Sequence, residues 1–149
     1  MQLVQASDAS RLAGITPHQL REWCARRGIV APDVPGSGRG RHALFAWQTV
    51  LTLRLLRELH QRFGAEVGAW GGALGEFRRL INGRSFPGLW GTLAAFPDKE
   101  QALLLDSRPV TAEALLMLPL APHLQVIARD FALPPDSQLP LFPALELRR

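Results

Sequence analysis

The chain has 149 residues, of which 47% are hydrophobic and 20% are charged, a balance that is typical of a folded protein and excludes a wholly disordered one. Its length suits one domain, or a small module joined to a second compact part. The most apolar run, residues 114–122, is far shorter than the ~20 residues that a membrane helix requires, so we expect no membrane association.

The start of the chain and its cysteine content both predict a cytoplasmic protein. Residues 1–10 have neither a basic start nor an apolar core, so we expect no signal peptide. Cys24 is the single cysteine, which excludes an internal disulfide framework and fits a reducing compartment.

The charges are unevenly distributed along the chain. Residues 1–64 contain nine Arg and four acidic residues, whereas residues 65–149 contain eight basic and nine acidic residues. Every basic residue except Lys99 is Arg, whose guanidinium group matches phosphates and guanine edges well. A basic first half joined to a nearly neutral second half favours a polyanion-binding module followed by a part with another role.

Two short helices joined by a tight turn are predicted near the N-terminus. The first is expected over residues 8–13, with Ser7 as its N-cap and Gly14 at its end. The second is expected over residues 17–27, because Thr16-x-x-Gln19 forms a capping box. Gly28 then supplies a left-handed residue that ends the helix. The pair is a helix-turn-helix unit.

A flexible basic hairpin is expected after the second helix. The apolar pairs Ile29-Val30 and Leu44-Phe45 suit short strands, and residues 31–43 between them contain two Pro, three Gly and two Arg. Such a hairpin is a wing, whose glycine-rich backbone can lie close to a phosphate ridge or enter a minor groove.

Two further helices are predicted, and the second suggests dimerisation. The first runs from about Ala46 to Phe63 and ends at Gly64. Over residues 65–82, apolar residues recur at spacings of 3, 4, 3 and 4, as in the seam of a coiled coil, although four glycines weaken the helix. The predicted dimerisation residues are Val67, Trp70, Leu74, Phe77 and Ile81.

Residues 83–149 are expected to form a small C-terminal α+β domain with a Pro-rich tail. Residues 89–96 and 102–106 suit strands, whereas 112–118 and 124–131 suit either helices or strands. The fold class is therefore mainly α: a winged helix-turn-helix domain over residues 1–64, a dimerisation helix over 65–82, and this C-terminal part.

The second helix and the hairpin carry the candidate DNA-binding residues. In a helix-turn-helix unit, the N-terminal part of the second helix lies nearest the base edges of the major groove. Helical spacing places Leu20, Trp23 and Cys24 on the inward face. Alone, the helix could equally be a solvated surface and a basic hairpin is more often a solvated loop, but their consecutive order favours DNA binding. The candidates are Thr16, His18, Gln19, Arg21, Arg26, Arg39, Arg41 and His42.

Residues 9–70 resemble the DNA-binding domain of MerR-family transcriptional regulators, through the motifs SRLAGIT, QLREW, RRGIV, GSGRGRHALF and VLTLRLLRELH. The resemblance implies a winged helix-turn-helix and an antiparallel coiled coil that forms a homodimer. It implies binding to pseudo-palindromic promoter DNA, which many members bend and untwist to activate transcription. It also implies phosphate contacts for Arg21 and the hairpin Arg residues, and base contacts for His18 and Gln19.

The chain departs from the family pattern at several positions. Glu22-Trp23 stands where the family usually has two aromatic residues, and no Tyr follows the hairpin arginines. One additional residue lies between Arg21 and Gly28, which is expected to rotate Arg26. Ala46 replaces the expected Ser or Thr cap of the third helix.

The sequence predicts no enzyme, no cofactor and no metal site. The four His residues lack the close spacing of metal ligands, and Cys24 is expected to be a small core residue rather than a sensor. A phosphate loop, a nucleophile paired with a base, and paired catalytic carboxylates are all missing from the sequence, so we name no catalytic residue.

The leading hypothesis is a homodimeric, sequence-specific transcriptional regulator that binds double-stranded DNA at a promoter. One alternative is an excisionase-like architectural factor that bends DNA. Another is an antitoxin or adaptor whose C-terminal part binds a protein partner. For residues 83–149 we rank stabilisation of the dimer first, and RNA polymerase or another protein is a further expected partner.

Overall fold

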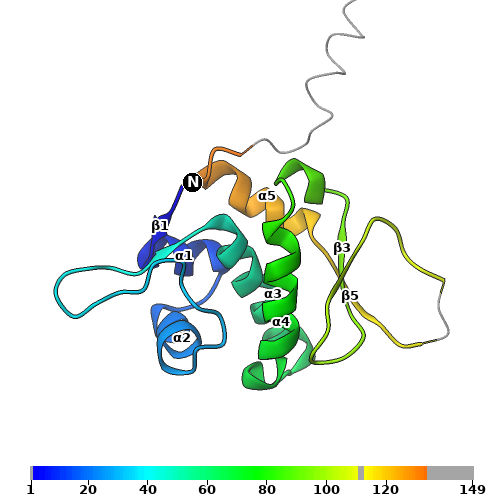
Figure 1. Ribbon diagram of the computed structural model, residues 1–149, viewed down its shortest axis with the longest axis horizontal. Helices are drawn as coiled ribbons and strands as arrows, with labels where there is room; N and C mark the ends of the chain where they lie inside the picture. The colour runs from blue at the N-terminus through cyan, green and yellow to red at the C-terminus, as the bar shows by residue number, and fades with distance from the viewer. Residues whose placement is uncertain (1, 111–112, 134–149) are drawn as a thin grey trace, which may run out of the picture.

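Helix α3 (Trp47–Phe63) lies at the centre of the computed structural model, which describes residues 2–110 and 113–133. Nine of its residues are buried, because α1, α4 and α5 all pack around it. A long hairpin projects at one end of the molecule, and a three-stranded sheet lies at the other (Figure 1). The prediction of a helix here is confirmed, and it ends before Gly64 as expected.

The N-terminal elements are a short strand and the expected helix-turn-helix pair. Strand β1 (Val4–Gln5) pairs with β2 (Leu44–Phe45) in antiparallel orientation, and α1 spans Ala6–Ala13. Helix α2 (Pro17–Leu20) continues into a π-helical segment, η1 (Arg21–Arg26). The predicted Ser7 cap is wrong, because α1 begins before Ser7 and its N-cap residue makes no side-chain hydrogen bond.

The segment Ile29-Val30 does not form the predicted strand. Its residues lie in a bend, and Val30 is 3% exposed and belongs to the core. The partner of Leu44 in the hairpin is instead Val34, through an isolated antiparallel bridge. The apolar pair was therefore a signal of burial rather than of strand pairing.

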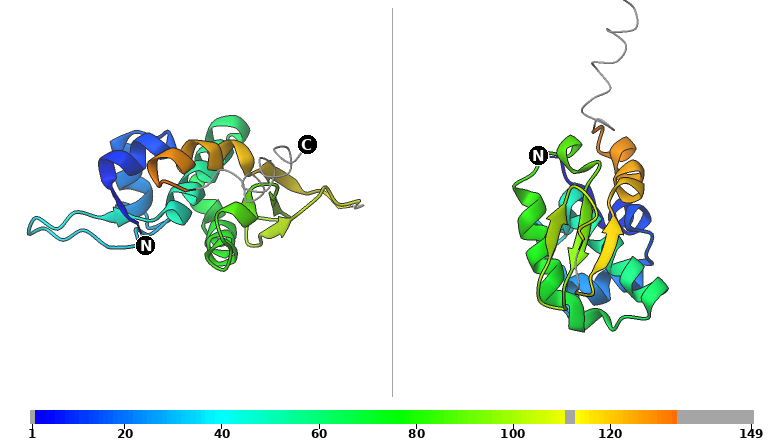
Figure 2. Two further views of the ribbon diagram at one scale, coloured as in Figure 1. Left: turned by 90° about the horizontal axis from the view of Figure 1, so that it is seen from above. Right: turned by 90° about the vertical axis from the view of Figure 1, so that its right-hand side faces the viewer.

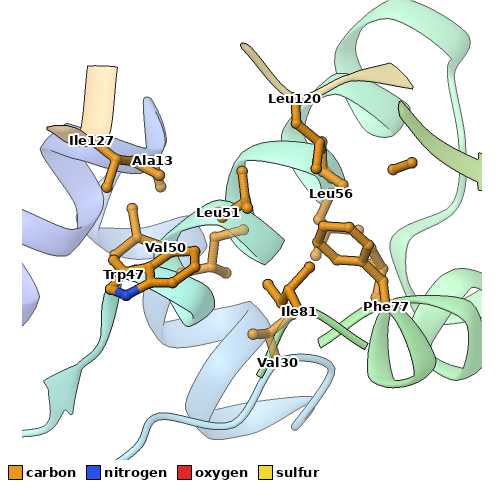
Figure 3. Close-up of a cluster of buried hydrophobic side chains, with 14 of the residues drawn as sticks. Ala13, Val30, Trp47, Val50, Leu51, Leu56, Phe77, Ile81, Leu120 and Ile127 are labelled. Carbon is orange, nitrogen blue, oxygen red and sulfur yellow. The ribbon is translucent and has the colours of Figure 1, made fainter. Parts of the chain in front are cut away.

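The heptad seam is covered within the chain. A 3-10 turn, η2 (Val67–Trp70), precedes α4 (Gly71–Asn82), and α4 packs on α3. Figure 3 shows Phe77 beside Leu56, and Ile81 beside Val30, in one cluster. Trp70 is partly buried against Phe96, with ring centroids 5.8 Å apart. Four of the five seam residues are at most 4% exposed: Val67, Leu74, Phe77 and Ile81.

The role of the seam as a surface for a second copy stays a prediction, although its side chains are largely buried within the single chain. A spacing of 3 and 4 marks one apolar face of a helix, and that face is needed wherever the helix is buried. Here the partner helix is α3 of the same chain. A side chain that is already buried cannot also contact a second copy unless α4 separates from the core.

The C-terminal part forms an antiparallel sheet and one helix. Strand β3 (Leu93–Phe96) lies between β4 (Leu103–Leu105) and β5 (Leu116–Pro119), after a short 3-10 turn, η3 (Pro87–Leu89). Both predicted strands are confirmed with shorter bounds. The two ambiguous segments are a strand, β5, and a helix, α5 (Ala121–Asp130). The predicted tail lies outside the described residues from position 134 onward.

A single hydrophobic cluster extends from Ala9 to Phe131. The predicted segments 1–64 and 65–82 and the described residues of 83–149 all contribute to it. In the part of the chain that the structure describes, no helix is both long and apolar enough to cross a membrane.

Candidate DNA-binding surface

The start of the second helix is held by the capping box predicted from Thr16 and Gln19. The Thr16 hydroxyl accepts a hydrogen bond from the Gln19 backbone N–H, and the Gln19 side-chain oxygen accepts one from the Thr16 N–H, each at 3.0 Å. Because Gln19 uses its oxygen for the cap, its amide N–H groups are the part that is left to contact a base. His18 lies in the first turn of the same helix and is exposed.

The additional residue in the second helix is accommodated by the π-helical segment Arg21–Arg26. The backbone N–H of Arg27 donates to the Glu22 carbonyl at 2.8 Å, a bond that spans five residues rather than four. Gly28 follows with a φ of 61°, which L side chains rarely adopt, and ends the helix as expected. The insertion thus widens one turn and leaves the helix end where the sequence predicts it.

Both arginines at the end of this helix bind glutamates of the chain. Arg26 pairs with Glu22 at 2.7 Å, and Arg27 pairs with Glu66 at 2.6 Å. Glu66 also accepts the N–H groups of the 3-10 turn before α4, and the hydrogen bond from Arg27 is the largest cause that lowers its pKa. Arg27 therefore fastens the end of the second helix to the body, whereas Arg21 has no such ion pair among the described residues.

The inward face of the second helix is the one predicted. Leu20, Trp23 and Cys24 are 4%, 5% and 8% exposed. Burial raises the pKa of Cys24 to about 12, so the thiol is protonated at neutral pH. This suits a small core residue, as expected, and does not suit a thiolate sensor.

The hairpin after the helix carries its charges at the tip. Val34 and Leu44 exchange backbone hydrogen bonds of 3.1 and 2.9 Å, and Ser37 N–H donates to the Arg41 carbonyl at 3.0 Å. Beyond these bonds the hairpin extends away from the body (Figure 1). Its three basic side chains are all exposed: Arg39, Arg41 and His42.

The base of the hairpin is fastened by Asp33. Its Oδ2 accepts the Ala46 backbone N–H at 2.7 Å and the Thr49 hydroxyl at 2.6 Å, at the start of α3. Its Oδ1 accepts from Arg78 of α4 at 2.9 Å, and Arg78 also donates to the Ala31 carbonyl at 2.6 Å. Asp33 therefore links the cap residue and the first turn of α3 to α4, although Ala46 itself provides no side-chain cap.

Sequence reasoning missed both Asp33 and Arg78. The signal that could have found Asp33 was the unsuitable cap residue at Ala46, because an uncapped helix start needs an acceptor from elsewhere. Arg78 had no such signal, since its partners are distant in the sequence.

A groove separates the second helix from the hairpin. It has a volume of about 390 Å³ and is lined by Arg21 and Ala25 of the helix and by Pro35 and Ala43 of the hairpin, among others. The lining of this groove is mostly apolar, with Arg21 as its charged residue, and the basic side chains of the hairpin lie outside it at the tip. A phosphate backbone that lies across the helix and the hairpin is within reach of Arg side chains from two directions.

The structure places the eight candidate residues on two neighbouring elements. Seven are exposed, and Gln19 is half-buried. Five belong to the capped helix and its π-helical segment, and three to the hairpin tip: Thr16, His18, Gln19, Arg21 and Arg26, then Arg39, Arg41 and His42. Among the described residues, no cluster of three or more His, Cys, Asp or Glu could hold a metal ion.

Comparison with known proteins identifies the same region. Residues 4–69 match the family described as MerR HTH family regulatory protein. The match begins at β1 and ends in the turn before α4, so it includes the capped helix, the hairpin and α3. No curated protein shows significant similarity to the chain. Residues 4–69 are thus similar to the helix-turn-helix domain of MerR-type regulatory proteins, a domain that binds DNA in transcription regulators.

Proposed function

We propose that the chain is a homodimeric, sequence-specific transcriptional regulator that binds a promoter in the cytoplasm. The observation that carries this proposal is the adjacency of the second helix and the hairpin, with exposed Arg21 on one element and the basic tip on the other. Exposed arginines beside a glycine-rich backbone favour contact with phosphates, and the capped helix start favours contact with base edges.

The two elements are proposed to have different roles in binding. The hairpin residues Arg39 and Arg41, together with Arg21, would contact phosphates, which contribute affinity and salt dependence. His18 and the amide of Gln19 would contact bases, which contribute sequence preference. Arg26 is the weakest candidate, because Glu22 already neutralises it.

The direct test is a mobility shift assay with the DNA upstream of the gene that encodes this chain. We expect a discrete complex that survives moderate salt and an excess of random DNA. A folded sample that binds both DNAs equally, or neither, would contradict sequence-specific binding.

Single substitutions separate the two roles. Arg39→Ala or Arg41→Ala is expected to weaken binding to all sequences and to reduce the salt slope by about one unit. Arg84→Ala removes the same charge from an exposed position outside the surface and serves as the matched control. His18→Ala leaves the capping box intact and is expected to change base preference. Equal losses on specific and random DNA for every variant would refute the division.

A monomeric, architectural DNA-bending factor is the second candidate. The burial of Leu74, Phe77 and Ile81 favours it, because the seam that suggested dimerisation is occupied by the chain itself. Strong bending of a labelled DNA fragment by a monomer, without an effect on a promoter reporter, would select this candidate over the first.

A further inference from the structure

A pocket lies where the C-terminal end of α3 meets the connection between β5 and α5. Figure 2 shows β5 leading into α5 at the edge of the sheet (right) and α5 lying along α3 (left). The pocket has a volume of about 300 Å³, at the lower limit of the range that small-molecule sites occupy. The residues that line it include none of the eight candidate DNA-binding residues, so it is a separate feature of the fold.

Apolar side chains form most of the pocket wall. They come from all three elements: Phe63 from α3, Met117 and Pro119 from β5, and Pro122 from α5. Phe63 is 55% exposed, although it is a large aromatic residue. A ligand with an apolar body would remove part of this ring from water, which favours its binding.

One polar group of the wall is almost completely buried. His123 lines the pocket and is 5% exposed. Its Nδ1 accepts a hydrogen bond from Arg54 Nε at 3.1 Å, and Arg54 does not line the pocket. Arg54 is itself held by a second hydrogen bond, from its Nη1 to the Leu12 carbonyl at 2.5 Å. The imidazole ring is therefore held in place from its Nδ1 edge.

The opposite edge of the His123 ring is a hydrogen-bond donor. A guanidinium group only donates, so Nδ1 must accept, and in the neutral imidazole the proton is then on Nε2. The ring is neutral at neutral pH, because burial first, and then Arg54, Arg57 and Arg62, lower its pKa to about 4. Glu58 Oε1, which also lines the pocket, lies 3.9 Å from Nε2, too far for a hydrogen bond. Among the described residues, Nε2 thus has no hydrogen-bond partner.

We propose that this pocket binds a small apolar molecule that carries a neutral hydroxyl group, such as a phenol or an aromatic alcohol. The hydroxyl oxygen accepts from His123 Nε2–H, and the hydroxyl hydrogen is donated to Glu58 Oε1. The site is argued from the pocket alone and does not depend on DNA binding.

The spacing of the two polar atoms favours a hydroxyl group. A single oxygen can lie about 2.8 Å from both His123 Nε2 and Glu58 Oε1, because these atoms are 3.9 Å apart. Such an oxygen must accept from the first and donate to the second, and a hydroxyl group does both. Water can do the same, but the apolar wall favours a hydroxyl group that carries an apolar body.

The charges around the pocket favour a neutral ligand. Glu58 repels an anion at the bridging position, and its other carboxylate oxygen already accepts from Arg62 Nε at 3.1 Å. The three arginines that lower the pKa of His123 repel a cation there. A phenol is uncharged at neutral pH, because its pKa is about 10. It can therefore enter without breaking the ion pair between Glu58 and Arg62.

The test is a titration of the full chain with 4-methylphenol at neutral pH, followed by nuclear magnetic resonance of the backbone amides. We expect one site, with the largest shifts around His123. In 4-methylanisole the oxygen accepts from His123 but cannot donate to Glu58, so it should bind roughly tenfold more weakly. In 1,4-dimethylbenzene a methyl group replaces the hydroxyl, and this ligand should bind most weakly of the three.

Two glutamate variants locate the hydroxyl contact. Glu58→Met keeps the length of the side chain but removes the acceptor, so it should bind 4-methylphenol and 4-methylanisole about equally. Glu22→Met is the matched control, because Glu22 also pairs with an arginine four residues later and does not line the pocket. The two glutamate side chains are similarly exposed, 26% for Glu22 and 21% for Glu58. Glu22→Met should preserve the tenfold difference, and far-ultraviolet circular dichroism checks folding.

Each outcome decides for or against the site. The expected ranking of the three ligands, with its first step lost in Glu58→Met and kept in Glu22→Met, would support it. An absence of shifts around His123 at the solubility limit of 4-methylphenol, or equal binding of all three ligands by the wild type, would overturn it. So would a preference for 4-methylphenol over 4-methylanisole that survives Glu58→Met. If Glu58→Met does not fold, the ranking by the wild type decides.

Discussion

The two ends of the molecule present exposed surfaces of opposite chemistry. The hairpin end carries Arg39, Arg41 and His42 on a backbone fixed by a capping box and by Asp33. At the sheet end, every side chain of the three strands is apolar, on both faces of the sheet. Polar groups position the first surface and hydrophobic packing positions the second, so each should respond to a different kind of change.

Helix α3 separates the two ends, which makes the comparison testable. Changes in the core should alter the free energy of unfolding without acting specifically on DNA affinity or on association. Changes at the hairpin end should alter DNA affinity, and changes at the sheet end should alter stability or association.

The largest effect is expected from Phe77→Ala. Phe77 is fully buried in the cluster that joins α3, α4 and the sheet, so its removal should cost about 3–5 kcal/mol of unfolding free energy. Urea unfolding at several protein concentrations measures this cost. Leu103→Ala should cost far less, because that side chain is 42% exposed. A folded Phe77→Ala protein that only dissociates would restore the coiled-coil interpretation.

A smaller effect is expected from His123, a buried group between α3 and the sheet end. Its Nδ1 accepts from Arg54 Nε at 3.1 Å. Burial first, and then Arg54, Arg57 and Arg62, lower its pKa from 6.5 to about 4. The imidazole is thus neutral at neutral pH, and its 3.9 Å approach to Glu58 is not an ion pair there.

Acid should therefore destabilise the protein through His123. The unfolded state binds the proton with the ordinary pKa, so stability is complete above about pH 6.5 and is lost as the pH falls toward 4. The loss should approach about 3 kcal/mol, measured by urea unfolding at a series of pH values. His123→Gln keeps an acceptor for Arg54 and should reduce the pH dependence.

A still smaller effect is expected from Asp33→Ala. The change leaves the Ala46 N–H and the Thr49 hydroxyl without their acceptor and should cost about 2 kcal/mol. It should also weaken DNA binding, because the hairpin base loses its link to α3 and α4. Asp98→Ala is the counterpart at the sheet end, where Asp98 accepts two backbone N–H groups. A similar loss of DNA affinity in both variants would show that stability alone explains the effect.

Local signals in the sequence predicted the polar end well. Thr16-x-x-Gln19 and Gly28 fixed the ends of the second helix, because caps depend on near neighbours. The insertion before Gly28 was also visible, and its result is the π-helical segment.

Signals that depend on distant partners were misread. The apolar spacing of α4 identified one buried face correctly, but it could not show that α3 of the same chain covers that face. The pair Ile29-Val30 is apolar for packing rather than pairing, and the two links made by Arg78 join segments that are far apart in the sequence. The sequence did not decide whether residues 112–118 and 124–131 form helices or strands, because short apolar runs suit both.

The smallest effect is expected from two glycines of the hairpin tip. Gly40 has a φ of 76°, whereas Gly38 does not have such a left-handed backbone, and a Cβ at either position would meet no atom within 4 Å. Gly40→Ala should therefore cost about 1 kcal/mol of backbone strain, and Gly38→Ala should be nearly neutral. The tip packs against no core, so it can relieve the strain by changing shape rather than by unfolding the protein. DNA affinity should therefore fall more in Gly40→Ala than in Gly38→Ala, with little change in urea unfolding for either. Equal affinities for the two variants would mean that the shape of the tip does not matter, and only its charges contribute to binding.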